Sequence, residues 1–274
     1  MEKCYVENLA MIITDRCNLD CAHCLRGKKC NRDMSDEVIE STLSQIRSIG
    51  NLAINGGEPT LAIDVIEKII NYVIDKQIKL QEFTVTINGT IYSEKLLELL
   101  DTINKYIGDE GINSLVAISL DRYHIAEVER LRITEEFNEN LRRYSESKHF
   151  YGWRNTDKKL FSEGNASNFD PSETVPIRPM KPVITYMNVD NHRKFDLERG
   201  VFCVGPIIAI SPTGIITECD ASIENQETIY NYGNVLTTSI QESTLGREHT
   251  LIKRPARFRK EVYKEYKRYQ TYNK

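Results

Sequence analysis

Apolar positions along the first 145 residues fall into two alternating patterns. Four short apolar runs predict buried strands, at residues 5–14, 52–55, 83–87 and 115–121. Between these runs, apolar residues recur every three or four positions and predict helices, at residues 36–49, 62–76, 93–107 and 125–145. Strands that alternate with helices through short connections form right-handed βαβ units and a parallel sheet. The chain is therefore expected to adopt an α/β fold, as an open sheet or a partial barrel.

The pattern changes in the second half of the chain. Residues 153–173 are rich in Asn, Ser, Asp and Gly, which indicates a loop, and residues 182–187 predict a further strand. Two apolar stretches, 207–211 and 215–219, flank Pro212-Thr213-Gly214 and predict a β-hairpin. The C-terminal part is thus expected to contain β structure of a different kind from the alternating first half.

Length and composition limit the class of protein. The chain has 274 residues, of which 40% are hydrophobic and 28% are charged, as in a globular protein that buries a sizeable core. This length suits one large α/β domain with a small appendage. The change in pattern predicts a boundary near residue 200, which divides the chain into domains 1–200 and 201–274.

Charge and hydropathy argue against several kinds of partner. The net charge of −4 gives no basic field for nucleic acid. No apolar run approaches the roughly 18–20 residues that span a bilayer, and the first residues lack the basic-then-apolar pattern of a signal peptide. We therefore expect a cytoplasmic protein with no membrane partner. In that compartment its seven cysteines are expected to be thiols or metal ligands rather than disulfides.

Cys17, Cys21 and Cys24 follow the first predicted strand directly and are spaced C-x3-C-x2-C. Three thiolates from one loop form a soft metal site. An iron–sulfur cube usually takes four cysteines, so three leave one iron open. Two alternatives remain at this point: a zinc site, which usually takes four protein ligands, and an apolar stripe on one helix face. Asn18 and Asp20 favour a turn over a helix interior.

Gly56-Gly57-Glu58-Pro59 follows the second predicted strand. Two glycines let the backbone approach a ligand closely, and the glutamate can accept a charge-assisted bond from a ligand's ammonium group. The alternative is an ordinary strand-to-helix turn with Glu58 in the first turn of the helix. Asn88-Gly89 and Ser119-Leu120-Asp121 also lie at strand ends. Because the chemistry of such folds sits at the carboxyl ends of the strands, these segments are expected to share one edge of the sheet.

Taken together, the cysteine loop and the Gly-Gly-Glu-Pro turn resemble the radical S-adenosylmethionine (radical SAM) superfamily over residues 5–125. The resemblance implies a partial (β/α)6 barrel in which Cys17, Cys21 and Cys24 hold a [4Fe–4S] cluster whose open iron binds the amine and carboxylate of SAM. It also implies a set of SAM-binding residues: Gly56, Gly57 and Glu58 at the methionyl amine, His23 near the adenine, and Asn88, Ser119 and Asp121 at the ribose and carboxylate.

The resemblance further implies an activity. One electron passes through the cluster to SAM, and the resulting 5′-deoxyadenosyl radical abstracts hydrogen from a substrate. The substrate is expected to be a peptide or protein side chain, or a small polar molecule such as a sugar or nucleotide. The electron donor is expected to be a flavodoxin or ferredoxin. The chain would then be an oxidoreductase or a transferase; the alternative is a non-catalytic zinc- or iron–sulfur-binding regulatory or interaction protein.

Cys203, Gly214 and Cys219, followed by Gly233-Asn234-Val235, resemble the opening of the SPASM/twitch domains that many radical SAM enzymes carry. Such domains hold auxiliary iron–sulfur clusters, for which Cys203 and Cys219 would be the ligands. No cysteine follows Cys219, so the alternative is a small β-hairpin-containing, twitch-like domain with two free thiols. The remaining histidines show no metal-ligand spacing and are expected to be ordinary: His124, His149, His192 and His249.

Overall fold

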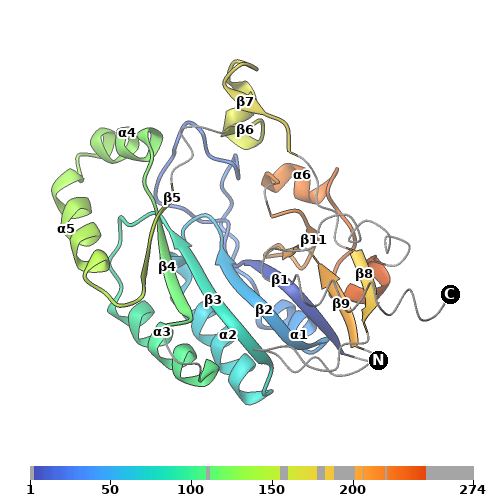
Figure 1. Ribbon diagram of the computed structural model, residues 1–274. Coiled ribbons are helices and arrows are strands. Elements are labelled where there is room, and N and C mark those ends of the chain that lie inside the picture. The colour runs from blue at the N-terminus through green and yellow to red at the C-terminus, as the bar shows by residue number, and fades with distance from the viewer. Residues whose placement is uncertain are drawn as a thin grey trace.

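The computed structural model of the chain describes residues 3–108, 112–154, 160–177, 183–187, 201–205, 207–219 and 221–244, with the backbone alone at 183–187, 201–205 and 244. No helix within these ranges is long and apolar enough to cross a membrane. Figure 1 shows a curved sheet with helices packed along one face and shorter elements gathered at one end of its strands.

The main sheet has nine strands. Its central part is parallel and follows chain order from β1 to β5: β1 (Cys4–Ile12), β2 (Ile46–Asn55), β3 (Lys79–Ile87), β4 (Ser114–Ser119) and β5 (Phe150–Arg154). Two later strands pair in parallel with the other side of β1: β9 (Val201–Gly205) and β10 (Ile208–Ile210). Two antiparallel strands follow at that edge: β8 (Val183–Met187) beside β9, and β11 (Ile216–Thr217) beside β10.

Helices connect the parallel strands. The larger ones are α1 (Asp36–Leu43), α2 (Ile63–Asp75), α3 (Glu94–Ile107), α4 (Arg122–Leu131) and α5 (Thr134–Ser145). The short ones are the 3-10 helices η1 (Pro59–Ala62) and η2 (Gly164–Asn168) and the helices α6 (Ile223–Glu227) and α7 (Ile240–Thr244). A separate pair of strands, β6 (Leu160–Phe161) and β7 (Thr174–Val175), flanks η2.

The hydrophobic core lies between the sheet and helices α1 to α3 (Figure 1). On this face the strands present fully buried large side chains, including Leu9, Leu52 and Phe83. The opposite face of β1 and β10 carries a smaller cluster of Ala10, Ile12 and Ala209, with Ala53, Ile207 and Cys219 packed against it.

The α/β fold and the parallel sheet are confirmed, and so are the strand at 183–187 and the hairpin of β10 and β11. The predicted helix 36–49 is wrong beyond Leu43. Ile46, Ile49 and Gly50 belong to β2, where Ile46 and Ile49 pair with Cys4 and Val6 of β1. Their three-residue spacing fits a helix face, but pairing with β1 buries both of them in the sheet.

The single helix predicted at 125–145 is also wrong. Arg132 adopts a left-handed conformation with φ of +59° and separates α4 from α5. Within the predicted loop 153–173 the described residues contain β6 and η2. The domain boundary near residue 200 and the twitch-like character of residues 201–274 stay predictions, although β9 and β10 join the same sheet as β1.

Candidate functional site

Backbone pairing between β1 and β2 continues past the ends of both strands and joins the two motifs. The Ile13 N–H donates to the Asn55 carbonyl over 2.8 Å. Beyond it, the Gly57 N–H donates to Thr14 and the Glu58 N–H donates to Arg16, each over 2.7 Å. The arm that leads into the cysteine loop is therefore bonded directly to the Gly-Gly-Glu turn.

The two glycines are required by this close pairing. A Cβ on Gly56 would lie 2.7 Å from the Thr14 carbonyl oxygen, and a Cβ on Gly57 would overlap with the Arg16 carbonyl. Real Cβ atoms do not come this close to backbone. In this structure the glycines admit the arm of the cysteine loop, whereas the sequence suggested that they admit a ligand.

The three cysteines of the loop are free and close together. Cys21 is buried, and Cys17 and Cys24 are partly exposed. Burial raises the pKa of Cys17, and it raises the pKa of Cys21 to about 12, with further increases from the neighbouring thiols of Cys24 and Cys17. Buried thiolates that repel one another need a cation between them. The donor set therefore fits a thiolate-ligated metal group such as an iron–sulfur cluster.

Two elements distant in sequence hold the cysteine loop. From η2, the Asn165 N–H donates to the Cys24 carbonyl over 2.9 Å, and Asn165 Nδ2 donates to the Cys21 carbonyl over 3.1 Å. Gly164 lies so close that a Cβ there would overlap with the Cys24 carbonyl. From α4, the buried Glu127 carboxylate accepts the Asp20 N–H over 2.8 Å. Spacing along the chain could not reveal these contacts of Asn165 and Glu127, because their partners lie more than a hundred residues away.

Glu58 is fully buried, and both of its carboxylate oxygens have partners within the protein. Oε1 accepts the Thr60 N–H over 2.9 Å and the Thr60 hydroxyl over 2.6 Å, and Oε2 accepts the Asn88 N–H over 2.6 Å. Burial raises its pKa, and these three bonds oppose that shift. Glu58 thus caps η1 and ties it to the end of β3; its contact with the methionyl amine stays a prediction.

Asn88 connects the end of β3 to the cysteine loop. Its Nδ2 lies 3.8 Å from Cys17 Sγ and 2.9 Å from Asn18 Oδ1. Its Oδ1 accepts the backbone N–H and the hydroxyl of Thr90, so the orientation of the amide is fixed. A side chain predicted to contact SAM therefore lies beside a predicted cluster ligand.

The carboxylate of Asp121 joins two histidines. Its Oδ2 lies 3.2 Å from His23 Nε2 and 2.9 Å from His124 Nδ1, and its Oδ1 accepts the backbone N–H groups of Tyr123 and His124. Burial alone would raise the pKa of Asp121, but the hydrogen bonds with His124 and His23 lower it well below its ordinary value. The predicted site residues His23 and Asp121 are thus in contact, and Ser119 lies two residues before Asp121 at the end of β4.

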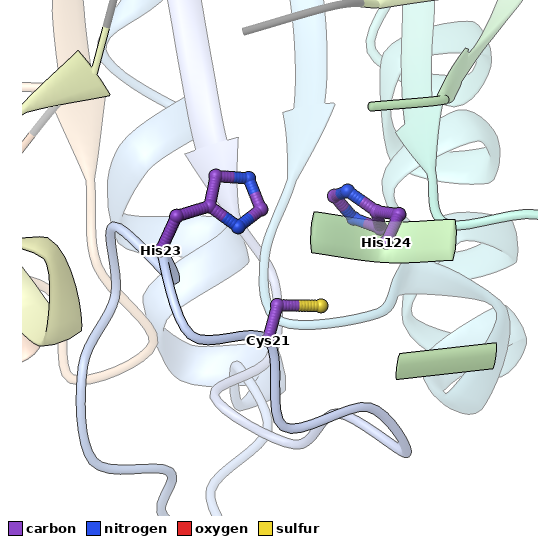
Figure 2. A group of neighbouring side chains, drawn as sticks. All are labelled: Cys21, His23 and His124. Atoms are coloured by element: carbon purple, nitrogen blue, oxygen red, sulfur yellow. The ribbon is translucent and has the colours of Figure 1, made fainter. Parts of the chain in front are cut away.

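His124 has a place that the sequence did not predict. Its ring lies beside His23 and the thiol of Cys21, and donor atoms of the three residues lie within 4.8 Å of one another (Figure 2). Spacing along one segment could not find this group, because α4 brings His124 to the loop from a hundred residues away. His124 therefore lies among possible metal ligands, which its position in the sequence did not indicate; His192 and His249 lie outside the described residues.

The two C-terminal cysteines have different positions. Cys203 lies in β9, opposite Tyr5 of β1. Cys219 follows β11 and packs on the inner face of the sheet, where Asn55 Nδ2 lies 3.8 Å from its Sγ. Whether these residues hold an auxiliary cluster stays a prediction.

The family model described as the radical SAM superfamily matches residues 11–147, half of the chain. This chain belongs to the radical SAM superfamily. Members of the superfamily bind a [4Fe–4S] cluster and SAM, and the loop, the turn and the strand ends described above all lie within the matched residues.

Relatives share this part of the chain. A probable GTP 3′,8-cyclase from Methanocaldococcus jannaschii is 34% identical over 122 residues, which cover 42% of this chain and 37% of that protein. A GTP 3′,8-cyclase from Clostridium perfringens (strain 13) is 30% identical over 128 residues, which cover 43% and 37%. The chain thus spans little more than a third of the length of these curated relatives.

Among solved structures, "Native anSMEcpe with bound AdoMet and Cp18Cys peptide" aligns with 87% of this chain and 79% of its own, at 16% identity and a TM-score of 0.45.

Proposed function

We propose that this chain cleaves SAM reductively at a [4Fe–4S] cluster held by Cys17, Cys21 and Cys24, and that the 5′-deoxyadenosyl radical abstracts hydrogen from a substrate. One observation carries the proposal. The Gly57 and Glu58 N–H groups donate to the arm of the cysteine loop, so the turn and the loop form one unit at the carboxyl ends of the strands. Three clustered thiols with no fourth cysteine beside them in the loop match a cluster with one open iron.

When bound, the reduced cluster supplies one electron to the sulfonium of SAM, whose bond to the 5′-carbon breaks homolytically to give methionine and the radical. The chain's own residues hold the reactants in place. The three cysteines provide thiolates, and Asn165 and Glu127 fix the backbone between them. Asn88, Ser119 and Asp121 are proposed to orient the nucleoside and carboxylate of SAM, and His23 is proposed to lie along the adenine.

The substrate is proposed to enter over the inner face of the sheet. Small side chains line that face at Ala10, Ala53 and Ala209, and Cys219 packs against this cluster. The proposed substrate is a peptide side chain or a small polar molecule. The names of the relatives support a purine nucleotide as a first compound to test. A flavodoxin or ferredoxin is the proposed source of the electron.

Anaerobic reconstitution with iron and sulfide tests the proposal. We expect about four irons per chain and, with dithionite and SAM, release of 5′-deoxyadenosine. Cys17→Ala is expected to abolish both, and Cys30→Ala serves as the matched control because Cys30 lies outside the motif. A colourless protein that leaves SAM intact would contradict the proposal. About eight irons per chain, reduced to about four in the Cys203→Ala/Cys219→Ala variant, would add an auxiliary cluster.

A further inference from the structure

Cys21, His23 and His124 form a second possible metal-ligating group. One donor atom from each residue lies within 4.8 Å of the other two, and the three side chains face a common space between the cysteine loop and the start of α4 (Figure 2). Cys21 and His23 are at most a tenth exposed, and the His124 side chain is 14% exposed. One thiol and two imidazoles are a donor set that zinc prefers.

The ring nitrogens are arranged for ligation. Asp121 Oδ2 lies beside Nε2 of His23 and Nδ1 of His124, so a metal bound here would use the opposite nitrogen of each ring. His23 Nδ1 is buried and has no hydrogen-bond partner among the described residues. A carboxylate bonded to one nitrogen of a histidine while the other nitrogen binds a metal is the usual outer shell of a zinc site.

The surroundings hold these rings in place before any metal binds. Asp121 is fixed by two backbone N–H groups at the start of α4. Tyr123 stacks on the His23 ring with centroids 4.6 Å apart and planes 17° apart. The Asp121 carboxylate places negative charge beside both rings. A negative, sulfur- and nitrogen-lined space favours zinc over magnesium or calcium, which prefer oxygen ligands.

We propose that Cys21, His23 and His124 bind one Zn²⁺ in the cluster-free chain, with Asp121 orienting both histidines and the fourth position of the metal open. Zinc bonds of about 2.0–2.3 Å place donor atoms roughly 3.3–3.8 Å apart, so the site closes by small side-chain movements. In the proposed function, on which this step rests, Cys21 is also a ligand of the iron–sulfur cluster. Zinc and the iron–sulfur cluster therefore exclude each other, and zinc holds the chain in a form that cannot take up the cluster.

Metal titration of the cluster-free, metal-free protein under anaerobic conditions tests this proposal. We expect one Zn²⁺ per chain, and with Co²⁺ as the probe a thiolate-to-cobalt charge-transfer band. His124→Ala is expected to weaken zinc at least 100-fold, and Asp121→Asn roughly 10- to 100-fold. His124→Cys restores a ligand and is expected to recover most of the affinity. Circular dichroism checks that each variant folds.

Variants at the shared loop separate the two metal sites. Cys17→Ala is expected to retain zinc and lose the iron cluster, whereas His124→Ala is expected to lose zinc and still assemble about four irons. Zinc added before reconstitution should block iron uptake in the wild type and leave it unaffected in His124→Ala. Equal zinc affinity in the wild type and His124→Ala, or loss of zinc in Cys17→Ala, would overturn the zinc site. Failure of the wild type to assemble iron, with the zinc pattern intact, would contradict only the proposed function and the exclusion.

Discussion

Asn88 Nδ2 donates toward Cys17 Sγ over 3.8 Å and so connects the end of β3 with the first cysteine of the metal-binding loop. The same amide nitrogen donates to Asn18 Oδ1 over 2.9 Å, and the amide oxygen is fixed by Thr90. Hydrogen bonds to cluster-ligating sulfurs withdraw negative charge and raise the reduction potential. The side chain is therefore positioned to tune the proposed cluster, in addition to its proposed contact with SAM.

Replacing this donor is expected to change the potential. Asn88→Asp keeps an oxygen for Thr90 but removes the N–H group and adds negative charge beside Cys17. We expect the reconstituted cluster to have a potential lower by roughly 50 mV, about 1 kcal/mol for one electron. Redox titration followed by electron paramagnetic resonance measures this shift. Asn168→Asp, on the exposed side of η2, is the control; equal shifts in both variants would mean that the Asn88 amide has no specific effect.

The close pairing of Gly57 with Arg16 leads to a second prediction. Gly57→Ala places a methyl group against the Arg16 backbone, so the arm of the cysteine loop must move. We expect the free energy of unfolding to fall by about 1–3 kcal/mol and most of the bound iron to be lost. Gly108→Ala is the matched control. Gly108 has φ of +68°, but its Cβ would meet neighbours only at 3.8 Å or more. Gly108→Ala should lower the free energy of unfolding by about 1 kcal/mol, because alanine is strained at this positive φ, and the variant should keep its iron. Iron retained in Gly57→Ala would show that the pairing does not control the loop.

Asn165 provides a third test, because η2 holds the loop through one side chain and one backbone group. Asn165→Ala removes the bond from Nδ2 to the Cys21 carbonyl but keeps the backbone bond to Cys24. We expect the reconstituted protein to lose iron to a chelator several-fold faster, since a bond of about 1 kcal/mol is lost from the closed loop. Asn168→Ala, in the same short helix and exposed, should release iron at the wild-type rate. Equal rates in the two variants would exclude a holding role for Asn165.

The sequence predicted the parts of this molecule whose signal is local. The cysteine spacing and the Gly-Gly-Glu-Pro turn each lie within one segment and indicated both the family and the edge of the sheet. The helix that was predicted to reach residue 49 shows the limit of that approach. Ile46 and Ile49 satisfy a helical period, and only their pairing with β1 selects the strand.

The side chains around the loop required the three-dimensional structure. Asn165, Glu127 and His124 come to the loop from segments more than a hundred residues away, and each uses a common residue type with no motif of its own. Glu58 illustrates a different limit. The motif indicated its position, but only the structure showed that Thr60 and Asn88 occupy its carboxylate oxygens.

Glu7 gives the last prediction, on the pH dependence of stability. This residue of β1 is only 4% exposed, and its Oε1 has no hydrogen-bond partner among the described residues. Burial raises its pKa from 4.5 to about 7. Below pH 4.5 the carboxyl is protonated in the folded and the unfolded chain alike. Between pH 4.5 and pH 7 the unfolded chain loses this proton while the folded chain keeps it, so stability falls across this interval by about 3 kcal/mol and levels off above pH 7.

Glu7→Gln removes this titration. Between pH 5 and pH 8 the free energy of unfolding of this variant should therefore fall by less than that of the wild type, and the difference between the two should approach about 3 kcal/mol. Urea unfolding of the cluster-free protein at the two pH values measures this change. A buried amide without partners also lowers stability, but it does so equally at both pH values, so only the change with pH reports on Glu7. Glu98→Gln, an exposed change on α3, should leave the wild-type pH dependence intact. If Glu7→Gln and the wild type lose the same stability on going to pH 8, Glu7 is already charged at pH 5, and a cationic partner must balance it in the folded chain.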